Sequence, residues 1–327
     1  MAEKQKKSNS SKKGSGSKST SSKESESKQK VSKIKTFCYS AIAVIVVLIV
    51  GIFADNDNNN NNTGLNNSGG SVEVHYIDVR QGDCIFIESE GQNMLIDCGE
   101  SSESDEVTAY LQEHNISRIN YLVGTHAHSD HMGGMSAIVD NFEIDNFYMP
   151  YISDDKMPTT KYFEKLLMSL DAKGLEITNP EVGDKINIGD AEILVVAPND
   201  KKYSNTNNYS IGLILTHGDN SFIFTGDAET MAEKEMIDNG LLKDINVYKA
   251  GHHGSSTSSS EEFLDVIKPE YAVIMCGTGN SYGHPNDDAL QRIGKYVSPE
   301  NLYRTDLYGS IVVQSDGSSI KFTTERQ

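Results

Sequence analysis

Cysteine is scarce in this sequence, with four residues in 327. No two of them have the spacing of a zinc knuckle, so a metal held by this chain would have histidine and carboxylate ligands. Cys84 and Cys98 flank an expected hairpin turn near Gly91, and a disulfide across that turn is one alternative. We favour buried, reduced thiols at Cys84, Cys98 and Cys276, while Cys38 lies in an apolar run.

Positive charge is in short supply beyond the N-terminus. Residues 1–35 hold eleven lysines and three glutamates, a balance of +8. Since the whole chain carries −18, residues 36–327 carry −26. A body of that charge repels polyanions unless its site is locally basic, which argues against tight binding of DNA.

The first 70 residues divide into three segments. Residues 1–35 are rich in Ser, Lys and Gly, which predicts a disordered, basic cytoplasmic tail. Residues 36–54 contain the uncharged run "FCYSAIAVIVVLIVGIFA", roughly 27 Å long as a helix and close to the thickness of a bilayer's hydrocarbon core. We interpret it as a single transmembrane signal-anchor. Residues 55–70 are rich in Asn and predict a flexible linker.

Two alternatives remain for the apolar run. A signal peptide cleaved after Ala54 would release the rest of the chain as a secreted protein. A buried core helix is disfavoured because the run has no polar face. Both the anchor and the cleaved peptide place residues 71–327 outside the cytoplasm.

Residues 71–327 alternate short apolar strands with single helices. Strands are expected at 72–79, 84–89, 93–98, 119–125, 146–152, 191–198, 210–217, 221–227, 245–250, 271–276, 310–316 and 319–325. Helices are expected at 105–114, 131–139, 161–173, 261–267 and 287–296, and from residue 228. This pattern predicts one α/β domain of two sheets covered by outer helices.

Three of the nine histidines gather in "GTHAHSDHMGG" at 124–134. His126 and His128 stand two apart after a strand, so an extended loop aims both imidazoles the same way. Asp130 and His131 follow as the chain turns into a helix. Imidazole and carboxylate suit zinc or manganese, and the two pairs predict ligands for two neighbouring metal ions.

Other candidate site residues follow later strands. Asp227 ends an apolar strand, where its two oxygens can bridge two cations or cap the next helix. His252 and His253 lie in the glycine-flanked turn "AGHHGS", where adjacent side chains are expected to diverge, one toward a metal and one toward substrate. His284, in "YGHPN", is a further candidate, with a surface histidine as the alternative. The remaining histidines are interpreted as structural or exposed: His75, His114 and His217.

Together these motifs resemble the metallo-β-lactamase superfamily, and within it the extracytoplasmic hydrolase domain of ComEC-type competence proteins. The resemblance is carried by the His-x-His-x-Asp-His loop and by these stretches in that group's order: "HYIDVRQGDCIFIE", "NMLIDCG", "NNYSIGLIL", "FTGDAE", "GHHGSSTS", "YGHPN" and "YRTDLYGSI". It covers residues 72–323. It implies an αβ/βα four-layer sandwich and a hydrolase domain at 71–327.

The resemblance also implies a site for two divalent metal ions, zinc or manganese. One ion would be held by His126, His128 and Asp227. The other would be held by Asp130, His131, Asp227 and His252. Asp97 would orient the histidine loop from behind the ligands.

This sequence departs from the superfamily pattern in two places. The superfamily usually adds a third histidine to the first site, but "NTNNYS" at 205–210 has none, so the first site is poorer in ligands. Arg80 stands where the group usually has glycine, and we expect it to place a bulky cation beside the motif loop and to alter the substrate mouth.

The implied reaction is metal-assisted hydrolysis, in which two cations lower the pKa of a bridging water from about 15.7 toward 7. Asp130 is expected to accept or position its proton, and His253 or His284 to stabilise the intermediate or protonate the leaving group. The candidates for binding substrate oxygens, with turn or capping roles as their alternative, are Asn208, Ser210 and Ser255.

A phosphodiester is the expected substrate. The resemblance favours DNA or RNA, with cell-wall teichoic-acid or phosphorylcholine esters as the alternative. One helix cannot translocate DNA, so we expect a stand-alone surface enzyme without an obligate protein partner. A tethered, non-catalytic binding module is the hypothesis from another class.

Overall fold

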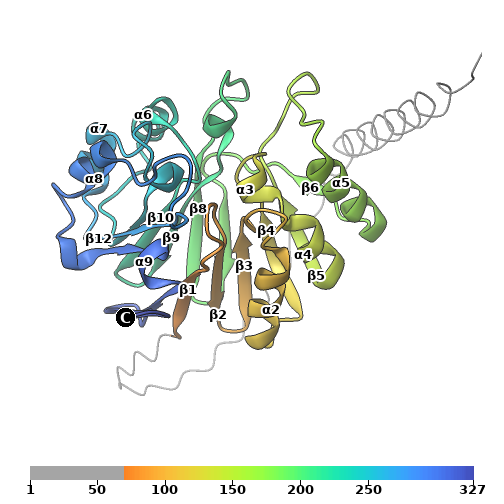
Figure 1. Ribbon diagram of the computed structural model, residues 1–327, viewed down its shortest axis with the longest axis horizontal. Coiled ribbons are helices and arrows are strands. Elements are labelled where there is room, and N and C mark those ends of the chain that lie inside the picture. Colours follow the sequence, from red (N-terminus) through yellow and green to blue (C-terminus); the bar gives the residue numbers. More distant parts are fainter. Residues whose placement is uncertain (1–69) are drawn as a thin grey trace, which may run out of the picture. The chain divides into compact units, whose positions relative to one another are not determined.

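The computed structural model of the protein describes residues 70–327 (Figure 1). The predicted tail at 1–35, signal-anchor at 36–54 and most of the linker lie outside the described residues. Within 70–327, none of the helices has the length and apolar character that crossing a membrane would need.

The first sheet of the described domain has eight strands in the order β15-β14-β1-β2-β3-β4-β5-β6. Their bounds are β1 Val72–Tyr76, β2 Ile85–Ser89, β3 Gln92–Ile96, β4 Arg118–Val123, β5 Glu143–Tyr148, β6 Ile177–Thr178, β14 Ile311–Ser315 and β15 Ile320–Thr324. Neighbours are antiparallel from β15 to β3 and parallel from β3 to β6. The parallel arrangement brings the carboxyl ends of β3 and β4 to the same edge.

The second sheet has seven strands in the order β13-β12-β11-β10-β9-β8-β7. Their bounds are β7 Lys185–Ile188, β8 Ala191–Ala197, β9 Gly212–His217, β10 Asn220–Phe224, β11 Val247–Lys249, β12 Tyr271–Ile274 and β13 Leu302–Arg304. Strands β10 to β13 are parallel, so the segments that follow β10 and β11 also leave from one edge.

The two sheets pack face to face, with helices outside them (Figure 1). The core between the sheets joins side chains such as Val74 and Ile87 of the first to Leu215 and Phe224 of the second. Helices α2 (Ser104–Glu113), α4 (Met135–Asn141) and α5 (Lys161–Lys173) lie beside the first sheet. Helices α6 (Thr230–Asp238), α7 (Glu261–Ile267) and α8 (Asp287–Ile293) bury apolar faces against the second. This is the two-sheet α/β sandwich that the sequence predicted.

The single helix predicted at 131–139 is wrong in detail, because the chain forms two helices there. These are α3 (Ser129–Met132) and α4, separated by Gly133 and Gly134. An added Cβ would lie 2.3 Å from Ser129 O at Gly133 and 2.4 Å from Cys98 O at Gly134. The two glycines therefore let the histidine loop pack directly on neighbouring backbone.

The interpretation of the cysteines is confirmed for the described residues. Cys84, Cys98 and Cys276 are buried and free. Burial raises the pKa of each thiol, that of Cys276 to about 12, so none is a reactive thiolate at neutral pH.

Candidate metal centre

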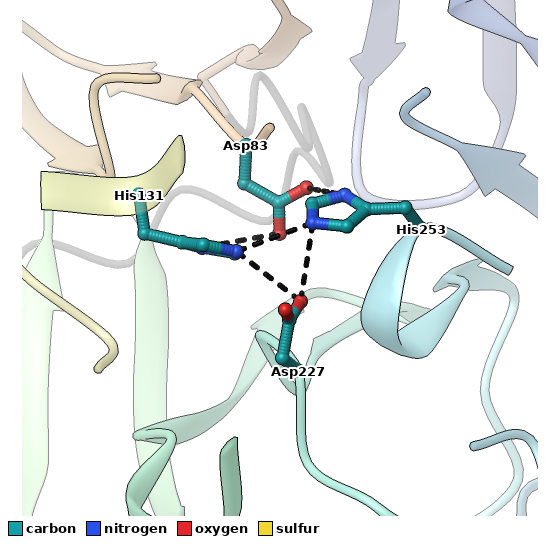
Figure 2. A group of neighbouring side chains, drawn as sticks. All are labelled: Asp83, His131, Asp227 and His253. Carbon is teal, nitrogen blue, oxygen red and sulfur yellow. Dashed lines mark hydrogen bonds and ion pairs between the residues drawn. The ribbon is translucent and has the colours of Figure 1, made fainter. Parts of the chain in front are cut away.

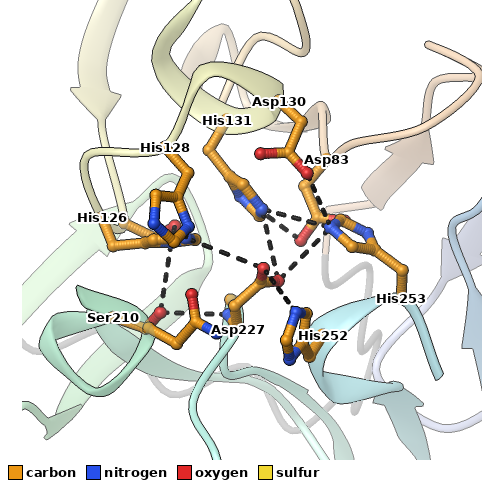
Figure 3. Close-up of polar contacts among 12 residues, drawn as sticks. Asp83, His126, His128, Asp130, His131, Ser210, Asp227, His252 and His253 are labelled. Carbon is orange, nitrogen blue, oxygen red and sulfur yellow. Dashed lines mark hydrogen bonds and ion pairs between the residues drawn. The ribbon is translucent and has the colours of Figure 1, made fainter. Parts of the chain in front are cut away.

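The predicted ligands meet where strands of both sheets end (Figure 3). Asp97 follows β3, and the loop of His126, His128 and His131 follows β4. On the second sheet, Asp227 follows β10, and the pair His252–His253 follows β11 in the short 3-10 segment η3 (Gly251–Gly254). Segments more than a hundred residues apart in the sequence thus supply one cluster.

Asp227 lies at the centre of this cluster, and its two carboxylate oxygens face different histidines. Oδ1 is 3.2 Å from His131 Nε2 and 3.5 Å from His253 Nε2. Oδ2 is 3.7 Å from His126 Nε2 and 3.6 Å from His252 Nε2. One carboxylate therefore has one oxygen available to each of two neighbouring cations.

Among residues 70–327, two groups of side chains are close enough to hold a metal ion, and both contain Asp227. His126, His128 and Asp227 form one, and Asp83, His131, Asp227 and His253 form the other (Figure 2). Within each group the ligand atoms all lie within 4.8 Å of one another. Asp130 adjoins the second group, with Oδ2 3.3 Å from His253 Nε2.

The η3 turn differs from the sequence expectation. His252 and His253 were expected to diverge, with His252 in the second group. Instead both have left-handed backbone angles, φ of 49° and 54°, and both imidazoles face Asp227. His253 joins the second group, while His252 faces the oxygen that His126 faces. Nδ1 of His253 is 3.0 Å from Met275 O, which leaves Nε2 for the cluster.

Asp97 makes the contacts expected of a carboxylate that orients ligands. It is fully buried and accepts hydrogen bonds from the backbone N of Thr125 at 2.8 Å and from Thr125 Oγ1 at 2.6 Å. Its Oδ2 is also 2.7 Å from His131 Nδ1. With Nδ1 engaged there, His131 presents Nε2 to Asp227.

The electrostatics of the cluster suit cations. Burial disfavours ionised Asp227, but His131 and His253 beside it hold the pKa of its carboxyl well below the ordinary value. Burial likewise lowers the pKa of His126, so that imidazole is neutral and can donate a lone pair. Asp83 Oδ1 and Asp227 Oδ1 are buried and accept no hydrogen bond from the described residues. Orphaned carboxylate oxygens facing imidazole nitrogens fit divalent metal ions.

Asp83 and Lys249 were missed by the sequence analysis. Lys249 is fully buried in β11, forms an ion pair with Asp83, and lies 3.4 Å from Gly226 O. Burial opposes ionised Asp83, but Lys249 and His253 lower the pKa of its carboxyl to about 2. The available signal was a lysine inside the apolar strand "INVYKA", because a buried charge needs a partner.

Ser210 occupies the region where the superfamily's third histidine was expected. Its Oγ accepts a hydrogen bond from the backbone N of Asp227 at 3.0 Å and lies 3.3 Å from His126 Nδ1. This small side chain therefore supports two of the candidate ligands from behind. It does not reach the cluster as an imidazole would.

Asn208 and Ser255 are engaged with the protein itself. Asn208 Oδ1 accepts a hydrogen bond from the backbone N of Glu229 at 3.0 Å, just before α6. Ser255 Oγ is 3.1 Å from Thr257 Oγ1 and accepts from the backbone N of Thr257. Both contacts favour the turn or capping role over substrate binding.

His284 lies beside the cluster, and Arg80 pairs with acidic side chains near α2. The His284 ring centroid is 5.5 Å from that of His252 and 6.2 Å from that of His253. Burial lowers the pKa of His284 to about 4, so the ring is neutral at physiological pH. The guanidinium of Arg80 pairs with Glu103 and Glu106 at the start of α2.

The fold and this cluster define a class, and comparison with known proteins identifies it. The chain belongs to the metallo-beta-lactamase superfamily, whose family model matches residues 77–278. It is 30% identical over 259 residues to ComE operon protein 3 of Bacillus subtilis, covering 73% of this chain and 32% of that protein. It is 27% identical over 236 residues to competence protein ComA of Neisseria gonorrhoeae, covering 72% and 31%. The chain thus spans about a third of the length of these relatives.

A solved structure shares the fold at low sequence identity. CmlA, a diiron beta-hydroxylase from Streptomyces venezuelae, superposes with a TM-score of 0.50 at 12% identity, covering 75% of this chain and 54% of that one. Family membership and the His/Asp cluster together support a metal-dependent hydrolase in the broad sense.

Proposed function

We propose that this chain is a metal-dependent phosphodiesterase, anchored by residues 36–54 and acting outside the cytoplasm. The observation that carries the proposal is the shared carboxylate of Asp227. Because its two oxygens face separate sets of imidazoles, the centre suits two ions close enough to act on one phosphate.

The proposed ligands follow from the two groups. His126, His128 and Asp227 would hold one ion, with His252 beside them. His131, His253, Asp227, Asp130 and Asp83 surround the place of the other. When bound, zinc or manganese would lower the pKa of a coordinated water and stabilise negative charge on phosphate oxygens.

Three side chains have proposed roles beyond metal binding. Asp130 is partly exposed, and its carboxylate would hold or accept the proton of the attacking water. His284 is neutral and half-buried at the rim, where it would contact the leaving group. His253, through Nε2, would be shared between the metal group and Asp130.

A nucleic acid is the preferred substrate, and a cell-wall phosphodiester is the alternative. The resemblance to competence proteins supports the first. The charge of −26 on residues 36–327 opposes a long polyanion and keeps the second open.

Metal content and turnover of bis-p-nitrophenyl phosphate test the enzymatic proposal. The full-length wild type should retain zinc or manganese by mass spectrometry and hydrolyse the ester. Asp227→Ala should lose bound metal and more than about 100-fold of the activity, because both ions lose a ligand. Asp219→Ala, at an exposed turn aspartate, is the matched control and should behave as the wild type.

Four other results would change the assignment of the site, the activity, the substrate or the location. Near-normal turnover by Asp227→Ala would overturn the assignment of the site. A wild type without metal and without turnover would favour the tethered binding module. Activity on teichoic-acid-like or phosphorylcholine esters, but not on DNA or RNA, would select the cell-wall substrate. Protease access to residues 71–327 on intact cells tests the extracytoplasmic location.

A further inference from the structure

A row of three aromatic rings leads from the metal centre to the surface. The ring of His253, in the cluster, faces that of His284 with centroids 6.2 Å apart and planes inclined by 29°. His284 in turn faces Tyr282, at 5.6 Å and 23°. Each ring is therefore within 30° of parallel to its neighbour, and Tyr282 is the outermost.

Tyr282 is unusually exposed for a residue of its size. Its relative exposure is 65%, the highest among the large hydrophobic side chains of residues 70–327. Its hydroxyl makes no hydrogen bond within that part of the chain. His284 lies against the ring, and most of the side chain is open to solvent.

The loop that carries Tyr282 is held in place by side-chain hydrogen bonds. Asn280 Oδ1 accepts from the backbone N of Tyr282 at 3.1 Å and of His284 at 3.0 Å. Asn280 Nδ2 donates to Gly277 O at 2.9 Å and to His284 O at 2.6 Å. Asn286 Oδ1 accepts from the backbone N of Ser256, which ties the loop to the segment after His253. The backbone position of Tyr282 is therefore fixed by the fold.

A second observation points to a ligand at the same place. His284 Nδ1 is buried and has no hydrogen-bond partner among residues 70–327. A buried polar nitrogen without a partner is costly unless a bound molecule or water satisfies it. It lies between the metal centre and the exposed ring, where a substrate would extend outward.

We propose that Tyr282 forms a stacking subsite for a nucleobase carried by the phosphodiester whose phosphate lies at the metal centre. The inference rests on the proposed function and narrows its substrate class to nucleotide phosphodiesters. Stacking on an aromatic ring is available to every base. It also needs no basic track along a polymer, so it suits a body of charge −26.

Equilibrium binding tests the subsite without relying on turnover. Full-length protein with Mn²⁺ is titrated with thymidine 5′-monophosphate and with ribose 5-phosphate, which has the same phosphate and no base. The wild type should bind the nucleotide roughly 5- to 100-fold more tightly. Tyr282→Ala should abolish this preference, and Tyr282→Trp should restore it. Met168→Ala, which trims another exposed apolar side chain on α5, should keep it.

Each outcome separates the subsite from the proposed function. Equal affinity of the wild type for the two phosphates, binding of neither, or a preference that survives Tyr282→Ala would overturn the subsite. Hydrolysis of thymidylyl-thymidine and of glycerophosphocholine is measured in parallel. Hydrolysis with no preference for the base keeps the proposed function and removes the subsite. A base preference in binding without hydrolysis of either ester keeps the subsite and overturns the proposed function.

Discussion

His252 and His253 both occupy the left-handed backbone region, at φ of 49° and 54°. For residues other than glycine this conformation costs roughly 1 to 2 kcal/mol each. The surrounding contacts must offset that cost, which is common where a side chain has to point in one direction for function. Here the result is that both imidazoles reach a single carboxylate.

Another histidine, His75, lies outside the centre and links stability to pH. It is buried in β1, with Nδ1 2.8 Å from the hydroxyl of Tyr110 and its ring 5.2 Å from that of His114, both from α2 and its end. Glu73 lies 3.3 Å from Nε2. Burial, reinforced by His114, lowers the pKa of His75 to about 4.

This pKa predicts a loss of stability on acidification. Between pH 6.5 and about 4 the unfolded chain binds a proton at this residue and the folded chain does not. The stabilisation that comes from keeping His75 neutral is therefore present in full above pH 6.5 and is lost as the pH falls. The free energy of unfolding should fall by about 3 kcal/mol over this range. Urea unfolding of wild type and His75→Gln should give free energies whose difference changes across this window and is constant above it. A constant difference throughout would contradict the prediction.

For single residues, the sequence predicts which side chains are candidate ligands, but it does not predict which way those side chains point. Four ligand-type residues in six positions after a strand indicate a metal loop whatever the loop's conformation. Whether His252 or His253 joins a given group depends on backbone angles that only the packed η3 turn imposes. Asp83 was overlooked because its partner, Lys249, is 166 residues away.

At the scale of elements, Asp83 and Lys249 connect the two sheets. Asp83 lies between β1 and β2, and Lys249 lies in β11 of the other sheet. Both side chains are almost completely buried. Removal of one partner from a buried ion pair leaves an uncompensated charge.

Asp83→Asn should therefore destabilise the metal-free protein by about 3 to 5 kcal/mol. The double variant Asp83→Asn/Lys249→Met should recover much of that loss, because the unpaired charge is gone. Urea unfolding in EDTA measures both. Asp238→Asn, which breaks the exposed pair with Lys234 on α6, is the control and should cost less than about 1 kcal/mol. If Asp83→Asn is no less stable than Asp238→Asn, the buried pair of Asp83 and Lys249 is not needed for stability.

Elements with a clear apolar period could be predicted from the sequence, and the shortest strands could not. The predicted helices at 161–173 and 261–267 match α5 and α7 because each has a clear apolar stripe of its own. Strands β6, β7 and β13 were missed. They have two to four residues each, too few for a period, and exist because a neighbouring strand pairs with them.

At the scale of the whole molecule, net charge affects access to the centre. Residues 36–327 carry −26, so a long nucleic acid approaches against repulsion that salt screens. For protein lacking the basic residues 1–35, we expect kcat/KM on long single-stranded DNA to rise several-fold as salt increases from about 50 to about 200 mM. The value of kcat/KM for bis-p-nitrophenyl phosphate, which carries one charge, should change little with salt. A fall of kcat/KM on DNA with increasing salt would instead indicate a local basic surface that binds the strand.

The sequence motifs predicted the overall architecture in more detail than the pattern of strands did. Alternation of strands and helices predicted two sheets with outer helices, which is correct. It did not give the order of strands, because pairing such as β14 with β1, 235 or more residues apart, leaves no local trace. The resemblance carried by the histidine loop and the segments after it supplied what periodicity could not.

The division of the candidate ligands between the two sheets has a thermodynamic consequence. His126, His128 and His131 come from one sheet, and Asp227, His252 and His253 from the other, so a bound ion would cross-link the two halves of the domain. By linkage, an ion at 100 times its dissociation constant adds about 2.7 kcal/mol to the stability of the fold. Chelation should then lower the melting temperature of the wild type but leave that of Asp227→Ala unchanged. Thermal unfolding, without any substrate, would therefore show whether the folded domain binds the metal through Asp227.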